Sequence, residues 1–295
     1  MIFFENTNKL VLLTMIVACQ VNACTKAQTK QFEQMQLTNS LSVKIEQSIS
    51  KEVEQLMSAY PALITGFEDN YIVFADSSKM LFDDRKEKSS EELLKNPDVQ
   101  DMFTYSYPIG EIGVPEKFHN PGRIRNDEFF KTIYGKTATE VQKNLIEIVW
   151  CPKLVGQKLR ISKINDVDKH LMAISTELDE HPEWKDYLHS TGTFNWRKVR
   201  SAKDRLSSHS FGIAIDLNTK YSNYWQWDCK CITENIDLTY KNKIPQGIID
   251  IFEKHGFIWG GKWYHYDTMH FEYRPELLLS KTDKLRKNAC LSILL

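Results

Sequence analysis

The sequence of 295 residues has no surplus of basic side chains, because 38 Lys and Arg stand against 39 Asp and Glu. Proteins that bind the phosphate backbone of nucleic acids usually carry such a surplus, so we exclude nucleic acid as a partner. The sequence also lacks a phosphate loop, a nucleophile elbow and internal repeats. Its aromatic fraction of 12% and charged fraction of 26% exclude a collagen-like or disordered chain. We therefore expect a globular protein.

An apolar run long enough to span a membrane is missing at the N-terminus, where residues 10–18 supply far fewer than the roughly 20 residues needed. This short run is typical of an export signal, and we predict a signal peptide of the lipoprotein type over residues 1–24. The sequence Ile-Val-Ala-Cys that ends at Cys19 resembles a lipobox, with cleavage before Cys24 as the alternative. We expect export to the cell envelope, either the periplasm or the outer surface, and membrane contact only through a lipid on Cys19.

Cysteines are few beyond the leader, and they include Cys151, Cys229, Cys231 and Cys290. Cys229 and Cys231 flank a single residue, a spacing that we expect to be too tight for an easy mutual disulfide. No second cysteine pair accompanies them, which argues against a metal site at this position. An exported chain permits disulfides, but the sequence does not assign the pairing.

The remaining chain divides by composition into segments of different character. A stretch rich in Gln, Thr and Lys predicts a flexible tether, and a loop punctuated by Gly and Pro precedes a soft boundary near Gly135. We predict a tether at 25–40, an N-terminal region of unknown role at 41–135, a catalytic domain at 136–282 and a C-terminal tail at 283–295.

Helical and strand-like patterns alternate in the second half of the chain. A capping box at Thr137 predicts a helix that runs past Ile148, and similar signals predict helices from Asn165 to Leu178 and from Pro245 to Gly256. Strand-like segments are 71–74 and 80–82, which form a hairpin, then 193–196, 212–217, 257–259 and 269–273. The mixture lacks repeating βαβ spacing, so we predict an α+β fold with a mainly antiparallel sheet flanked by helices.

Two of these strand-like segments carry side chains suited to metal chemistry. In the first, alternation places Asp216 and the small residues Gly212 and Ala214 on one face of a strand, and His209 lies just before it. In the second, His270 and Glu272 share a face. If the two strands are neighbours, His209, Asp216 and His270 converge.

Two imidazoles and one carboxylate form the three-ligand set of a catalytic zinc site, in which the fourth position is open to water. Such a site needs a base, and Asp267, three residues before His270, is the candidate. Glu272 is placed to orient a ligand histidine from behind. A single histidine beside a strand is more often structural, but the pairing of H-x-x-G-x-A-x-D with D-x-x-H is hard to explain by packing alone.

At these residues the chain resembles the LAS metallopeptidases, which include D-alanyl-D-alanine carboxypeptidases and L-alanyl-D-glutamate endopeptidases. The resemblance spans about residues 140 to 280 and implies a Hedgehog/DD-peptidase-like fold, Zn²⁺ on His209, Asp216 and His270, and Asp267 as base. It also implies an arginine near the scissile carbonyl, for which Arg197 is the best match.

The function implied by the resemblance is hydrolysis of an amide bond in the peptidoglycan stem peptide. Aspartate at the base position and the segments around Trp196 and Trp259 resemble the L-alanyl-D-glutamate branch. Trimming of terminal D-alanine is the alternative activity, with Arg197, Arg200, Arg205 and Lys262 as candidates to hold the terminal carboxylate. A zinc-containing cell-wall binding module without catalysis is the alternative of another class. Trp263 and Tyr266 are candidates for the cleft wall, whereas we expect His265 to serve in hydrogen bonding.

Overall fold

The computed structural model describes residues 49–199 and 202–278 of the chain. From Lys51 onward the described residues belong to one compact unit. Among them, no helix is both long and apolar enough to cross a membrane. The predicted signal peptide, tether and C-terminal tail lie outside the described residues, as does Arg200.

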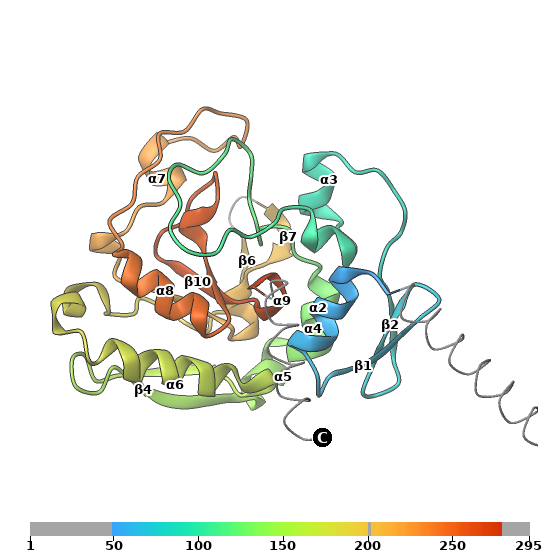
Figure 1. The fold of residues 1–295 in the computed structure, drawn as a ribbon, viewed down its shortest axis with the longest axis horizontal. Helices are drawn as coiled ribbons and strands as arrows, with labels where there is room; N and C mark the ends of the chain where they lie inside the picture. Colours follow the sequence, from blue (N-terminus) through green and yellow to red (C-terminus); the bar gives the residue numbers. More distant parts are fainter. Residues whose placement is uncertain (1–48, 200–201, 279–295) are drawn as a thin grey trace, which may run out of the picture. The chain divides into compact units, whose positions relative to one another are not determined.

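Helices and strands are interleaved along the chain, and every sheet is antiparallel (Figure 1). The helices are α2 (Lys51–Ala59), α3 (Ser90–Lys95), α4 (Asp127–Tyr134), α5 (Ala138–Lys143), α6 (Val167–Leu178), α7 (Trp225–Cys229), α8 (Gln246–Lys254) and α9 (Pro275–Leu278). The strands are β1 (Ile64–Glu68), β2 (Tyr71–Phe74), β3 (Lys79–Leu81), β4 (Leu145–Trp150), β5 (Gln157–Ser162), β6 (Lys198–Val199), β7 (Ala202–Leu206), β8 (Ala214–Asp216), β9 (Phe257–Trp259) and β10 (His270–Tyr273). The α+β class is confirmed, while the Hedgehog/DD-peptidase-like fold stays a prediction.

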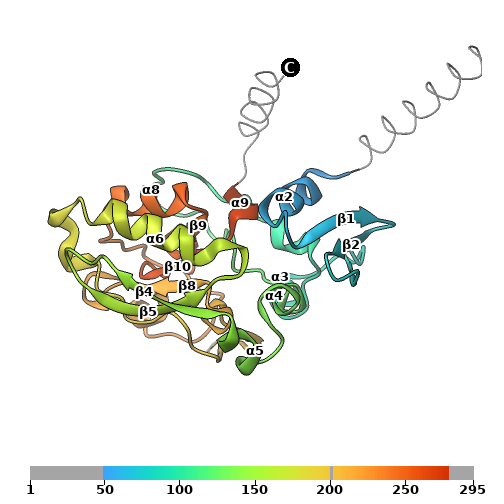
Figure 2. The ribbon, with the colours of Figure 1, turned by 90° about the horizontal axis from the view of Figure 1, so that it is seen from below.

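The strands form several small sheets. β1, β2 and β3 form one sheet near the start of the unit, and β8, β10 and β9 form another, with β10 in the centre. The pairs β4–β5 and β6–β7 are two-stranded. Figure 2 shows α6 and α8 side by side on one side of the β8–β10–β9 sheet. The predicted hairpin at 71–82 is confirmed as β2 and β3.

Helix α8 anchors the β8–β10–β9 sheet. Pro245 precedes its first turn and Gly256, with φ of +88°, ends it, as the sequence predicts. Its apolar stripe includes Phe252, whose ring stacks on Phe271 of β10 at 3.9 Å between centroids. Burial of one such ring stabilises the fold by about 1.5–3 kcal/mol. This contact therefore packs α8 against β10, the central strand of the sheet.

The predicted helix from Thr137 past Ile148 is wrong in its second half. Thr137 caps a helix, but α5 ends at Lys143 and the following residues form β4, paired with β5. Ile148 and Trp150 are buried and the residues between and before them are exposed, which is the period-two pattern of a strand. Leu145 and Ile148 also fit a helical spacing, and the short apolar run was ambiguous between the two periods.

Two smaller sequence-based expectations are also corrected. Residues 193–196 form no strand; the local strand is β6, which begins at Lys198. Cys229 and Cys231, expected to be too close for an easy bridge, form a disulfide with their Cα atoms 5.2 Å apart. That separation lies within the usual range, because the end of α7 and Lys230 with φ of +54° bend the chain back between the two cysteines.

Candidate metal centre

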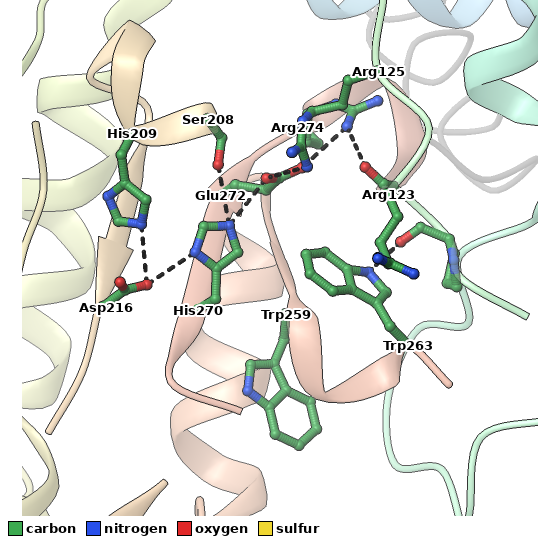
Figure 3. Close-up of polar contacts among 12 residues, drawn as sticks. Arg123, Arg125, Ser208, His209, Asp216, Trp259, Trp263, His270, Glu272 and Arg274 are labelled. Atoms are coloured by element: carbon green, nitrogen blue, oxygen red, sulfur yellow. Dashed lines mark hydrogen bonds and ion pairs between the residues drawn. The ribbon is translucent and has the colours of Figure 1, made fainter. Parts of the chain in front are cut away.

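The register of two adjacent strands brings the predicted metal ligands together. Asp216 of β8 lies directly opposite His270 of β10. The Nδ1 atom of His270 lies 2.9 Å from Oδ1 of Asp216, and Nε2 of His209 lies 3.1 Å from the same oxygen (Figure 3). The candidate ligand atoms of His209, Asp216 and His270 all lie within 4.8 Å of one another. The predicted convergence of these three residues is therefore present.

His209 reaches the site from a short 3₁₀ helix, Ser208–Phe211, that precedes β8. Gly212 ends this helix with φ of +65°, and a Cβ atom there would lie 2.5 Å from Leu145. Only glycine combines this backbone conformation with this close approach. The turn at Gly212 thus supplies the bend that places a histidine from outside the strand beside a carboxylate on it.

The outer nitrogen of each histidine is held by a protein acceptor. His209 Nδ1 lies 2.5 Å from the carbonyl oxygen of Thr193, and His270 Nε2 lies 3.0 Å from Oε2 of Glu272 and 3.2 Å from Oγ of Ser208. A metal-binding histidine typically donates its second N–H to a carbonyl or carboxylate in this way. The arrangement leaves Nε2 of His209 and Nδ1 of His270 directed at Asp216.

These donors fit a zinc ion. His209 Nε2 is buried and its contact with Asp216 Oδ1 at 3.1 Å lacks hydrogen-bond geometry, so within the described part of the chain the lone pair of this nitrogen is available to a metal ion. Burial disfavours the charged forms, yet the two imidazoles hold the pKa of Asp216 well below its usual range. Burial alone would lower the pKa of His270, but Asp216 and Glu272 raise it to about 10. The carboxylate therefore already favours a cation at this position.

Asp267 lies at the turn that leads into β10. Its backbone N–H donates to the carbonyl of Gly260, and its carbonyl accepts from the N–H of His270. The Oδ1 atom is buried and has no hydrogen-bond partner among the described residues. Burial raises the pKa of Asp267 to about 7, with Asp216 adding to the rise, while His270, His209 and Arg197 oppose it. A half-buried carboxylate in this state suits proton transfer near neutral pH.

A cleft of about 460 Å³ opens over these residues. His209, Asp216, His270 and Asp267 line it together with Arg197, whose side chain is exposed. The other lining side chains include Trp225, Trp227, Trp263, Arg123, Arg125 and Arg205. Trp263 lines the cleft as expected, whereas Tyr266 is buried and its hydroxyl donates to Asp228 and Thr239.

Arginines from outside the recognised motifs also reach this cleft. Arg123 and Arg125 come from the loop before α4, in the region for which the sequence offered no role. Arg123 pairs with Glu234, while Arg205 forms no ion pair with a described carboxylate. Burial, with the charges of Arg125 and Arg123, lowers the pKa of Arg205 to about 9. The only sequence signal for the pair at 123 and 125 is their alternation in a Gly-Arg-Ile-Arg loop.

His265 has the role predicted from the sequence, whereas Lys262 does not have the role considered for it. His265 is a hydrogen-bonding residue as expected, since Nδ1 contacts Asn120 Oδ1 at 3.2 Å and Nε2 contacts the Glu234 carbonyl at 2.8 Å. Lys262, considered as a carboxylate holder, is unsuited to that role because it is buried and paired with Glu253 at 2.5 Å. Of the four cations considered for a terminal carboxylate, the described ones that reach the cleft are Arg197 and Arg205.

Two histidines and one carboxylate that line a cleft, beside an Asp267 Oδ1 atom with no hydrogen-bond partner among the described residues, are the donor set expected of a catalytic zinc site. Comparison with known families agrees: residues 200–273 match the family model described as D-alanyl-D-alanine carboxypeptidase. The resemblance to this zinc peptidase family is thereby confirmed for the segment that contains His209, Asp216, Asp267 and His270. The match begins at residue 200 and so does not include Arg197. No curated protein and no solved structure matches the chain.

Proposed function

We propose that the protein is a zinc-dependent peptidase that hydrolyses an amide bond of the peptidoglycan stem peptide. The observation that carries the proposal is the meeting of His209, Asp216 and His270 beside Asp267 in the wall of one cleft. The family match over residues 200–273 supports the peptidase class. We further propose that the protein acts in the cell envelope, anchored by a lipid on Cys19.

The residues divide the chemical work by position. When bound to His209, Asp216 and His270, zinc supplies a Lewis acid that polarises a carbonyl and acidifies a water molecule. Asp267 accepts the proton of the attacking water, because its Oδ1 atom has no other partner in the described residues. Arg197, in the cleft wall, stabilises the developing oxyanion. Asp267 then returns the proton to the leaving amine.

We propose the bond between L-alanine and D-glutamate as the target. Support comes from aspartate at the base position and from the similarity around Trp196 and Trp259 to that branch. No lysine among the described residues is available in the cleft to bind a terminal carboxylate. Lys262 is buried and paired with Glu253 instead. A carboxypeptidase remains the second candidate, since the matched family model carries that description and Arg205 lines the cleft without an ion pair to any described carboxylate.

Digestion of defined muropeptides by the zinc-loaded protein tests this proposal. Mass spectrometry of the products should show cleavage between L-alanine and D-glutamate. Release of free D-alanine with that bond intact would establish the carboxypeptidase alternative. Zinc binding and peptidoglycan binding without any cleavage would establish a binding module. Asp267→Ala is the matched control, because it removes the base and leaves the three ligands in place.

A further inference from the structure

Behind the metal ligand His270 lies a buried row of charged side chains. Glu272 and Arg274 of the same chain segment are completely inaccessible to solvent, as is Glu276 at the start of α9. Arg274 donates to Glu272 Oε1 at 3.1 Å and to Glu276 Oε1 at 2.5 Å. Its guanidinium also lies over the ring of Phe130 at 5.1 Å. One arginine therefore satisfies one oxygen of each carboxylate.

The second oxygen of Glu272 is shared by two donors. His270 Nε2 lies 3.0 Å from Oε2, and Nη1 of Arg125 lies 3.2 Å from the same atom. Figure 3 shows the two side chains approaching Glu272 from opposite sides. Within the described part of the chain, Arg125 is the only guanidinium that contacts Oε2. Arg125 thus fixes the position of the very oxygen that orients the metal ligand.

Glu276, the second carboxylate in the row, is also held by residues from before Gly135. Tyr60 of α2 donates its hydroxyl to Glu276 Oε2 at 2.8 Å, and Gln55 donates to the Glu276 carbonyl at 3.0 Å. Residues from before Gly135 therefore complete both ends of a charge row whose other members follow His270. A carboxylate buried this deeply needs such partners, because an unpaired one costs several kcal/mol.

We infer that Arg125 is a positioning residue for the metal centre: it holds Glu272 so that the carboxylate accepts the Nε2–H of His270 and directs Nδ1 toward Asp216. The region 51–135 is therefore part of the peptidase site and not a separate module. This inference rests on the proposed zinc site. It adds a role for a residue that lies outside the matched segment 200–273.

The test compares Arg125→Gln with the wild type in the full chain. We expect the zinc dissociation constant, measured by competition with a chelator, to rise about 10- to 100-fold, the usual effect of removing a partner behind a metal ligand. The matched control is Lys262→Gln, which also removes a buried cation paired with a carboxylate but contacts no metal ligand. It should lower the melting temperature of the zinc-free protein and leave zinc affinity unchanged.

A purely structural role for Arg125 predicts a different result. Arg125→Gln would then lower the melting temperature as Lys262→Gln does, with unchanged zinc affinity, and this outcome overturns the inference. If Arg125→Gln does not fold, Arg125→Lys decides, because a flexible ammonium replaces the planar guanidinium; at least about a threefold loss of zinc affinity is required. Absence of zinc binding by the wild type overturns the proposed function as well, whereas zinc binding without peptide cleavage leaves this inference intact.

Discussion

Two buried carboxylates, Glu253 and Glu272, are each paired with a buried cation but differ in their distance from the candidate metal ligands. Glu253 of α8 accepts from the Tyr107 hydroxyl at 2.6 Å and pairs with Lys262, whereas Glu272 pairs with Arg125 and Arg274. Each one attaches a segment from before Gly135 to the second half of the chain. Only Glu272 also contacts a metal ligand. A buried ion pair of the same kind therefore lies beside a candidate metal ligand in one place and away from the candidate ligands in the other.

The largest difference between variants at the candidate metal site beside Glu272 and variants at Glu253 should appear in their zinc content. Replacing His209, Asp216 or His270 by Ala should remove zinc, which we expect at about one ion per chain in the wild type. Glu253→Gln should keep its zinc because it contacts none of the ligands. Elemental analysis of the purified variants measures this. Full zinc occupancy in the three ligand variants would disprove the site.

The next effect concerns activity without loss of metal. Asp267→Ala should retain zinc and lose about 10²- to 10⁴-fold in turnover, because general base catalysis contributes a factor of that size. Turnover on muropeptides and zinc content are measured on the same sample. Undiminished activity would show that another group takes the proton.

A smaller effect should appear in the dependence of stability on pH. Burial, together with the charge of Arg123, lowers the pKa of His265 to about 4, below the value of about 6.5 expected in the unfolded chain. The unfolded state therefore binds more protons between these values, so His265 should cost up to about 3 kcal/mol of stability as the pH falls from 6.5 to 4.

His265→Gln removes this titration and keeps an amide that can hydrogen-bond. Chemical denaturation at several pH values should show a shallower acid slope for this variant than for the wild type. Identical slopes would mean that His265 titrates normally in the folded protein.

The smallest expected effect concerns the residues that contact Glu253. Tyr107→Phe removes a hydroxyl that donates to Glu253 and accepts from the backbone N–H of Trp259 at 2.9 Å. We expect a loss of about 1–3 kcal/mol in the free energy of unfolding, as for other buried groups left without a partner. Zinc affinity should not change. A lower zinc affinity in this variant would show that the contacts of Glu253 and Glu272 are energetically coupled.

The sequence was informative where the chemistry is local. The candidate ligands His209, Asp216 and His270 lie in two short motifs, and strand alternation predicts the face of its own strand that Asp216 and His270 each occupy. The helix at 245–256 carried clear start and stop signals. The helix signals and the strand alternation depend on residues close together in the chain, and the structure confirms both. The pairing of β8 with β10 joins residues 54 positions apart, and the sequence-based prediction had to assume it.

The sequence was uninformative where the contacts are long-range. Nothing near Arg125 indicates that it pairs with Glu272, because 147 positions separate them. The strand β4 was hidden because a short apolar run fits two periods, and its partner β5 was not recognised at all. The Cys229–Cys231 bridge depends on a backbone bend at Lys230 that spacing alone does not reveal.

The hydrogen bond between Tyr60 and Glu276 has a consequence for how the chain folds. It joins residues 216 positions apart, so the chain must be synthesised as far as Glu276 before the bond can form. Contacts of such high sequence separation are slow to form because a long loop must close first. We therefore expect the contacts between Tyr60 and Glu276 to form after the local helices and hairpins. A chain that ends before Glu276 would retain His209, Asp216 and His270 in its sequence and lack the carboxylate that joins Tyr60 of α2 to Arg274.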